Sequence, residues 1–181
     1  PTPQHWQTLR TIYRSLGGTT VEHDETNTPE DFIPPTRSGQ TTDGKGRGIF
    51  AAKDIRKGER TYGGKKNFAF FSTGNEFRNY VDEVANQLSN DAACDIMMWA
   101  WVQPLMGDDY ETLIVVVLDN NSLMNDGGEE LANTGCLEEE MSEYECGMFD
   151  EYALRDIREG EEILCDYDRF EHRSLWKEFG L

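Results

Sequence analysis

Three short segments, far apart in the chain, constrain its fold more than any property of its composition. The first is a glycine-rich run that leads into an apolar stretch, Lys45-Gly46-Arg47-Gly48-Ile49-Phe50. The second is Met124-Asn125-Asp126-Gly127, and the third is Cys165-Asp166-Tyr167. Each segment is too short to be informative alone, but their order and spacing together narrow the choice of fold sharply.

The glycine-rich run has the composition of a turn before a strand. Gly44, Gly46 and Gly48 alternate with other residues, and Ile49 begins the apolar stretch. The run lacks the Gly-Lys-Ser/Thr ending of a phosphate-binding loop, and it precedes a strand rather than a helix. Both features argue against a site for nucleoside triphosphates or dinucleotides. Taken alone, such a run is most often a simple turn.

The charge of the chain limits its partners. The 181 residues include 35 acidic and 17 basic side chains, a formal net charge of −18. A surface of that sign repels phosphate backbones and attracts cationic ligands, so we expect no direct binding of nucleic acid. Composition also allows the acidity to serve solubility alone. The acidic stretch at residues 138–145 is either a solvated loop or a surface that recruits a cationic substrate.

Metal and membrane sites are not expected. The chain has four cysteines and three histidines: Cys94, Cys136, Cys146, Cys165, His5, His23 and His172. They form no Cys-x-x-Cys pair and no ligand cluster, so we expect no metal site and predict free, buried thiols. No apolar run in the sequence approaches the roughly 18 residues of a membrane span, so we expect no membrane association.

Local patterns predict short strands and peripheral helices. Thr2 suits a helix cap, and Trp6, Leu9 and Tyr13 then share one helical face. Residues 19–42 lack an apolar period and are predicted to form a surface loop or linker. Thr73 and Glu76 have the spacing of a capping box in front of a second helix.

Strands are predicted over residues 49–55 and 60–63, and over residues 96–103 and 111–118 as a hairpin. Residues 113–118 are apolar without alternation, so both faces of that strand should be covered. The neighbouring Trp99 and Trp101 are interpreted as core or as the wall of a substrate groove.

Together the three segments resemble those of the SET-domain protein lysine methyltransferases. Residues 46–59 resemble the opening Gly-x-Gly strand and lysine-aspartate-isoleucine turn of that family, and residues 153–167 resemble its closing segment. The resemblance covers about residues 44–170. It implies a mainly β fold with peripheral helices (α+β), of the β-clip SET type, in which residues 124–134 and the closing segment form a knot-like active site.

The resemblance also implies a domain plan. Residues 1–42 would form a helix and linker. Residues 43–170 would form the catalytic domain, with a helical insert at about 66–95. Residues 171–181 would form a C-terminal helix.

The activity implied by the resemblance is protein-lysine N-methylation with S-adenosylmethionine. The partner would be a histone tail or another basic, lysine-containing protein, in the nucleus or cytoplasm. Tyr167 corresponds to the catalytic tyrosine of the family, and Tyr62 and Tyr144 correspond to tyrosines that line the lysine channel. Cys165 occupies the position two before Tyr167, where relatives carry a bulky ring that limits methylation. A small side chain there predicts di- or trimethyl-lysine.

Cofactor contacts are implied for the first two segments and for two aromatic residues near the third: Lys45, Gly46, Arg47, Gly48, Asn125, Asp126, Phe170 and Trp176. Relatives carry Asn-His-Ser-Cys-x-Pro-Asn where this chain has residues 125–133. Asn125 and Asn133 match, Asp126 replaces the histidine, and two extra residues separate the asparagines. This departure leaves open a catalytically inactive SET-like module that binds a peptide or partner. A small β-rich domain with purely structural tyrosines is the third alternative.

Overall fold

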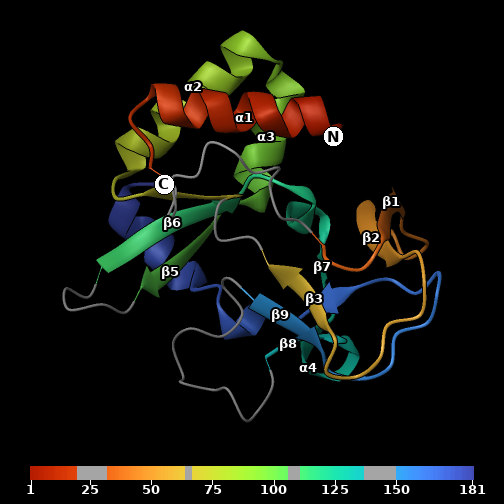
Figure 1. Cartoon of the computed structure of the whole chain (residues 1–181). Helices are drawn as coiled ribbons and strands as arrows, with labels where there is room; N and C mark the ends of the chain where they lie inside the picture. Colours follow the sequence, from red (N-terminus) through yellow and green to blue (C-terminus); the bar gives the residue numbers. More distant parts are fainter. Residues whose placement is uncertain (20–31, 64–66, 106–110, 137–149) are drawn as a thin grey trace. The chain divides into compact units, whose positions relative to one another are not determined.

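Segments from distant parts of the chain combine into two units. The computed structural model describes residues 1–19, 32–63, 67–105, 111–136 and 150–181. The helical unit consists of Pro1–Asp24, Lys66–Asp119 and Glu171–Leu181, and the strand unit consists of Glu25–Lys65 and Asn120–Phe170. Figure 1 shows the helices α1, α2 and α3 close together, and β3, β9 and β8 side by side.

The first helix of the helical unit begins and buries its face as the sequence predicts. α1 spans Pro3–Ser15, and Thr2 caps it by accepting a hydrogen bond from the backbone N–H of His5 at 3.2 Å. Proline suits this first turn because its missing N–H would have no partner there. The buried residues of α1 are Trp6, Leu9, Arg10, Ile12 and Tyr13.

Two further helices follow. α2 spans Gly74–Gln87 and begins with the predicted capping box, in which Thr73 and Glu76 accept each other's backbone N–H groups. α3 spans Asn90–Trp99. The prediction that residues 96–99 begin a strand is therefore wrong. A short apolar run fits a helix or a strand equally well. Ser89 caps a helix whose last turn includes residues 96–99.

A three-stranded antiparallel sheet completes this unit. Its strands are β4 (Phe68–Phe71), β5 (Trp101–Leu105) and β6 (Glu111–Val117), in the order β4-β6-β5. The pairing of β5 with β6 confirms the predicted hairpin, although β5 is shorter than expected. Residues 113–118 are all buried, so the prediction that both faces of β6 are covered is confirmed.

The core of the helical unit forms between these helices and the sheet. Its largest contributors are aromatic and branched side chains: Trp6, Leu9, Ile12, Tyr13, Phe71, Phe77, Tyr80, Ile96, Ile114 and Leu118. Trp99 packs 5.2 Å from Trp6 between ring centroids, which agrees with its interpretation as a core residue. The last element, the 3₁₀ helix η5 (Arg173–Phe179), packs against the same cluster through Leu175, Trp176 and Phe179.

The strand unit begins with a hairpin that the sequence did not indicate. β1 (Thr36–Gln40) pairs antiparallel with β2 (Arg47–Ala51). The prediction of a loop throughout residues 19–42 is therefore wrong for residues 36–40. β1 has no apolar alternation because it is mostly exposed, and its order comes from the backbone hydrogen bonds that it makes with β2.

Short strands build the rest of this unit. One sheet has the order β3-β9-β8, with β3 at Arg60–Gly63, β9 at Asp150–Ala153 and β8 at Thr134–Gly135. A parallel pair joins β7 (Asn125–Asp126) to β10 (Leu164–Cys165). Three single-turn helices lie between or after these strands: η2 (Asn120–Leu123), α4 (Gly128–Leu131) and η4 (Tyr167–Arg169).

The cysteines only partly match their prediction. Cys165 is free and buried, as predicted, but Cys94 is free and exposed. Cys136 is disulfide-bonded, which contradicts the expectation of free thiols. Cys146 lies outside the described residues. In the part of the chain that the structure describes, no helix combines the length and apolarity that crossing a bilayer demands.

Removing the capping box should destabilise the fold measurably. Thr73→Ala deletes the acceptor for the backbone N–H of Glu76, and we expect the free energy of unfolding to fall by about 1 kcal/mol in urea titration. Ser72→Ala, at the exposed neighbouring position, is the control and should change it by less than about 0.5 kcal/mol. Equal losses in both variants would contradict the assigned cap.

Candidate active site

The third sequence segment is held between the first two. Residues 161–163 run along β2, where the backbone N–H of Ala51 donates to Glu161 at 2.9 Å and that of Ile163 donates to Ile49 at 2.7 Å. The chain then pairs in parallel with β7, and the N–H of Gly127 donates to Cys165 at 2.8 Å. The fold therefore brings all three segments together, as the sequence predicts.

Asn133 fastens the closing segment from the other side. It is fully buried, and its backbone N–H donates to the carbonyl of Leu164 at 2.9 Å. Its side chain accepts the N–H of Leu164 at 2.9 Å and donates to the carbonyl of Glu162 at 2.7 Å. A buried amide that satisfies its backbone neighbours in this way fixes their path, because any shift would leave polar groups unpaired.

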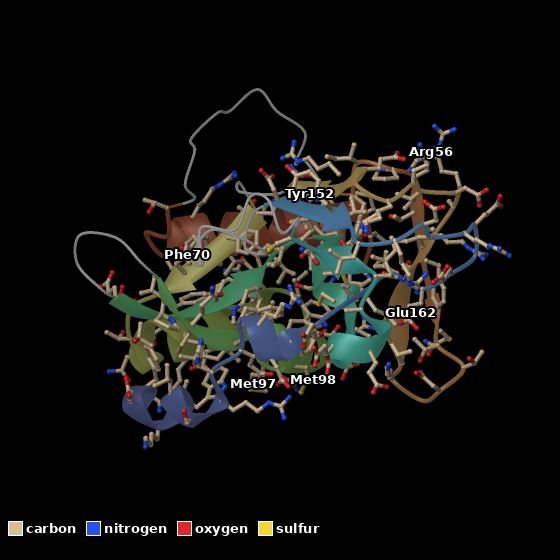
Figure 2. All side chains as sticks on the ribbon, turned by 90° about the horizontal axis from the view of Figure 1, so that it is seen from below. Arg56, Phe70, Met97, Met98, Tyr152 and Glu162 are labelled. Carbon is tan, nitrogen blue, oxygen red and sulfur yellow. The ribbon has the colours of Figure 1, made fainter. Side chains whose placement is uncertain are left out.

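Asn125 ties the second segment to the first. Its amide nitrogen donates to the carbonyl of Arg47 at 2.9 Å and to Oε1 of Glu162 at 2.8 Å. Figure 2 labels Glu162, which forms an isolated bridge with Phe50 of β2. Sequence reasoning assigned no role to Glu162, although it lies within the closing motif. Its position between β2 and Asn125 makes it part of the support of the site.

The two glycines of the first segment serve different purposes. At Gly48, a Cβ atom would overlap Oε1 of Glu162 and would lie 2.9 Å from Cγ2 of Thr41. The space beside Gly48 is thus filled by protein. At Gly46, φ is +89° and no atom lies within 4 Å of a Cβ position. Gly46 therefore needs to be glycine for its backbone conformation, and the space beside it is open.

Asp126, at the position where the family has histidine, binds the backbone at Gly128 and at Tyr167. Its Oδ1 accepts the backbone N–H of Gly128 at 2.9 Å and that of Tyr167 at 3.1 Å. Its carbonyl accepts Nζ of Lys45 at 2.9 Å. The substitution therefore provides an anchor for Tyr167. The single turn of α4, Gly128–Leu131, lies within the stretch that separates the two asparagines.

Tyr167 lies at the meeting point of the three segments. Its hydroxyl donates to the carbonyl of Met124 at 2.7 Å, so the ring is fixed at both its backbone and its tip. The ring of Phe170 lies 5.4 Å away at an angle of 56°. The two rings together provide an aromatic surface next to the second segment.

Cys165 and Tyr62 are both buried. Burial raises the pKa of the Cys165 thiol well above its usual value, and the negative charges of Glu151, Asp126 and Asp166 raise this pKa further. The thiol therefore stays protonated. Tyr62 is fully buried on β3 and packs against Phe32, with 5.5 Å between the ring centroids.

The remaining predicted site residues are not among the described residues of the strand unit. Trp176 belongs to the helical unit, where its ring lies 6.2 Å from that of Phe77. Tyr144 and the acidic stretch at 138–145 lie outside the described residues. Among the described residues, no three His, Cys, Asp or Glu side chains gather as metal ligands would.

A family comparison covers all three segments. The sequence model of the family described as the SET domain matches residues 46–168. No curated protein matches the chain significantly.

Several solved structures are similar to the chain. A humanized mutant of Polycomb Repressive Complex 2 from Chaetomium thermophilum is 20% identical, with a TM-score of 0.49 over 82% of this chain and 17% of that chain. The ctPRC2 complex in an autoinhibited conformation bound to S-adenosylmethionine is 19% identical, with a TM-score of 0.48 over 80% and 17%. CpSET8 from Cryptosporidium is 18% identical, with a TM-score of 0.41 over 73% and 56%. The chain thus spans only part of each of these proteins.

The stability of the protein should depend on the hydrogen-bonding oxygen of Asp126 more than on its negative charge. Asp126→Ala leaves two backbone N–H groups without their acceptor, so the free energy of unfolding should fall by about 2 kcal/mol. Asp126→Asn keeps an oxygen at Oδ1 and should cost less than about 1 kcal/mol. Urea titration of both variants checks this. If the alanine variant were as stable as the parent, Asp126 would not anchor Tyr167.

Proposed function

The chain belongs to the SET-domain family, and from this premise we propose that it is a protein-lysine N-methyltransferase that uses S-adenosylmethionine. The observation that carries the proposal is the fixed position of Tyr167. Its hydroxyl and its backbone are both hydrogen-bonded to the second segment, at the junction of all three matched segments. A tyrosine that only fills core space could lie anywhere in the strand unit, whereas Tyr167 lies where the three segments meet.

The residues around Tyr167 suit this cofactor. Gly46 leaves open space beside the backbone. Its neighbours in the chain, Lys45 and Arg47, are both cationic, and Lys45 is paired with Asp43 at 3.3 Å. The rings of Tyr167 and Phe170 offer an aromatic surface of the kind that an adenine stacks on. Asn125 ties the second segment to the carbonyl of Arg47, and the carboxylate of Asp126 ties it to the backbone of Tyr167. We assign the methionine end of the cofactor to Lys45, Gly46, Arg47 and Asn125, and the adenine to Phe170.

The chemistry needs alignment more than it needs a strong base. S-adenosylmethionine, when bound, supplies a methyl group that passes in line from sulfur to a neutral amine. The protein must then exclude water and hold the amine in place. We assign to the hydroxyl of Tyr167 the orientation of the amine, and to Tyr62 and Cys165, which are both buried, the walls of the lysine channel. The closing segment keeps these groups in place through Asn133.

The proposed substrate is a basic protein, with a histone tail as the first choice. A net charge of −18 raises the local concentration of lysine-rich segments around the chain. Such substrates are met in the nucleus or cytoplasm.

The small side chain of Cys165 leaves room for a methylated amine to rotate, so we propose that the reaction proceeds to di- or trimethyl-lysine.

The second candidate is a SET-like module that binds a peptide without turnover. The replacement of the histidine by Asp126 motivates it. One measurement distinguishes the two functions: only the enzyme methylates a basic substrate in the presence of S-adenosylmethionine.

Cofactor binding should depend on Asn125. We expect the parent protein to bind S-adenosylhomocysteine in calorimetric titration, and Asn125→Ala to weaken this binding at least about tenfold because its amide hydrogen bonds are lost. Asn90→Ala, on the exposed first turn of α3, is the matched control and should bind as the parent does. A folded Asn125→Ala variant with parental affinity would overturn the assigned cofactor site.

Turnover should depend on the hydroxyl of Tyr167. Tyr167→Phe keeps the ring, so binding of S-adenosylhomocysteine should persist while methyl transfer falls by roughly a hundredfold or more. Mass spectrometry of core histones and basic peptides after incubation with S-adenosylmethionine gives the readout. A parent protein that binds the cofactor but methylates none of these substrates would favour the binding module.

A further inference from the structure

A buried carboxylate lies on β9 of the strand unit, where the proposed reaction assigns it no role. Glu151 is only 4% exposed. Its Oε2 accepts a hydrogen bond from the hydroxyl of Thr134 at 3.2 Å. Carboxylates are rarely buried unless something requires their charge, because taking the charge out of water is costly.

Two threonines point toward this charge. The hydroxyl oxygens of Thr61 and Thr134 lie 2.6 Å apart, and both residues are fully buried. A hydroxyl has one proton to donate. When Thr134 gives its proton to Glu151, Thr61 gives its own to Thr134, and the resulting chain of donors ends on the carboxylate. The carbonyl of Tyr152 lies 3.3 Å from the Thr134 hydroxyl and is the alternative acceptor of its proton.

Glu151 belongs to the wall that contains the channel residues. Tyr62 of β3 is its direct partner in the antiparallel register, so the two side chains leave the sheet on the same face. The charge of Glu151 also acts on Cys165, as the raised pKa of that thiol indicates. Glu151 therefore lies near both of the described residues assigned to the lysine channel.

The other charges that act on Cys165 have the same sign. Asp126 on β7 and Asp166 after β10 also raise the pKa of its thiol. Both lie nearer the surface than Glu151, whose low exposure keeps solvent from screening its charge. A cation placed beside Cys165 meets a negative potential, and Glu151 is the most buried of the three carboxylates that create it.

We propose that Glu151 is a specificity-determining residue that recognises the substrate lysine by its positive charge and accepts a hydrogen bond from its ammonium group. This inference rests on the proposed function. Neutral side chains of similar length gain nothing from the carboxylate, so the residue favours lysine over them. The ammonium group loses one proton to solvent before water is excluded. The neutral amine then attacks the methyl carbon of S-adenosylmethionine as the S–CH3 bond breaks, which leaves S-adenosylhomocysteine and a methylated, protonated amine.

If Glu151 binds the ammonium group, removing its charge should weaken substrate binding but make the bound amine easier to deprotonate. The negative charge favours the ammonium form, so it raises the pKa of the bound amine. Glu151→Gln keeps the shape of the side chain and removes the charge. The substrate should then bind more weakly, and the bound amine should lose its proton at lower pH. A merely structural role for Glu151 would instead lower affinity and rate together.

The test uses core histones as the substrate and S-adenosylmethionine as the donor. For Glu151→Gln we expect KM for histone to rise at least about tenfold. The pH midpoint of kcat should move down by about one unit, and affinity for S-adenosylhomocysteine should stay unchanged. Glu151→Asp keeps the charge and should restore much of the parental KM. Glu159→Gln removes one exposed charge of the same unit and should match the parent.

A second measurement needs no variant at position 151. In the parent enzyme, the n-butylammonium ion should inhibit histone methylation at least about tenfold more strongly than 1-butanol, which has the same length without the charge. Equal inhibition by the two, or an active Glu151→Gln variant with parental KM and pH midpoint, would overturn the inference alone. A parent protein that methylates no basic substrate would overturn the proposed function and the inference with it.

Discussion

The site depends on one buried amide. Asn133 satisfies three backbone groups of the closing segment, and without it the short pairing between β7 and β10 would have little to hold it. Two-residue strands make too few hydrogen bonds to be stable alone. Asn133 lies two residues after the end of α4, so its hydrogen bonds also fix the chain where that turn ends. The hydrogen bonds of Asn133 therefore help to position the closing segment, which contains Glu162, Cys165 and Tyr167.

Support on the opposite side comes from a network of polar side chains. Asn125 joins the carbonyl of Arg47 to Glu162, and Glu162 in turn fills the space beside Gly48. The glycine, the amide and the carboxylate therefore form a single unit, in which a change at any one position alters the other two. Asp126 extends this network to the backbone of Tyr167. The substitution that most weakened the resemblance thus contributes to the same support.

Sequence reasoning succeeded where a local rule fixes the outcome. The capping box at Thr73 and the unbroken apolar run of β6 are properties of a few adjacent residues, and both were predicted correctly. It failed where a partner strand decides, as for β1, whose polar residues carry no period of their own. The helical end of α3 was missed because an apolar run suits either structure. The convergence of the three segments was predicted through the resemblance, whereas Glu162 and Glu151 emerged only from the three-dimensional contacts.

The interleaving of the two units has a consequence for biosynthesis. The chain passes from one unit to the other between residues 24 and 25, 65 and 66, 119 and 120, and 170 and 171. Neither unit is a continuous stretch, so neither can be completed before its own last segment, residues 120–170 or 171–181, has been synthesised. The helical unit waits for η5 before Trp176 and Phe179 can cover its core. The apolar core of the helical unit therefore stays incompletely covered until residues 171–181 have been synthesised, and exposed apolar surface of this kind favours aggregation of the nascent chain.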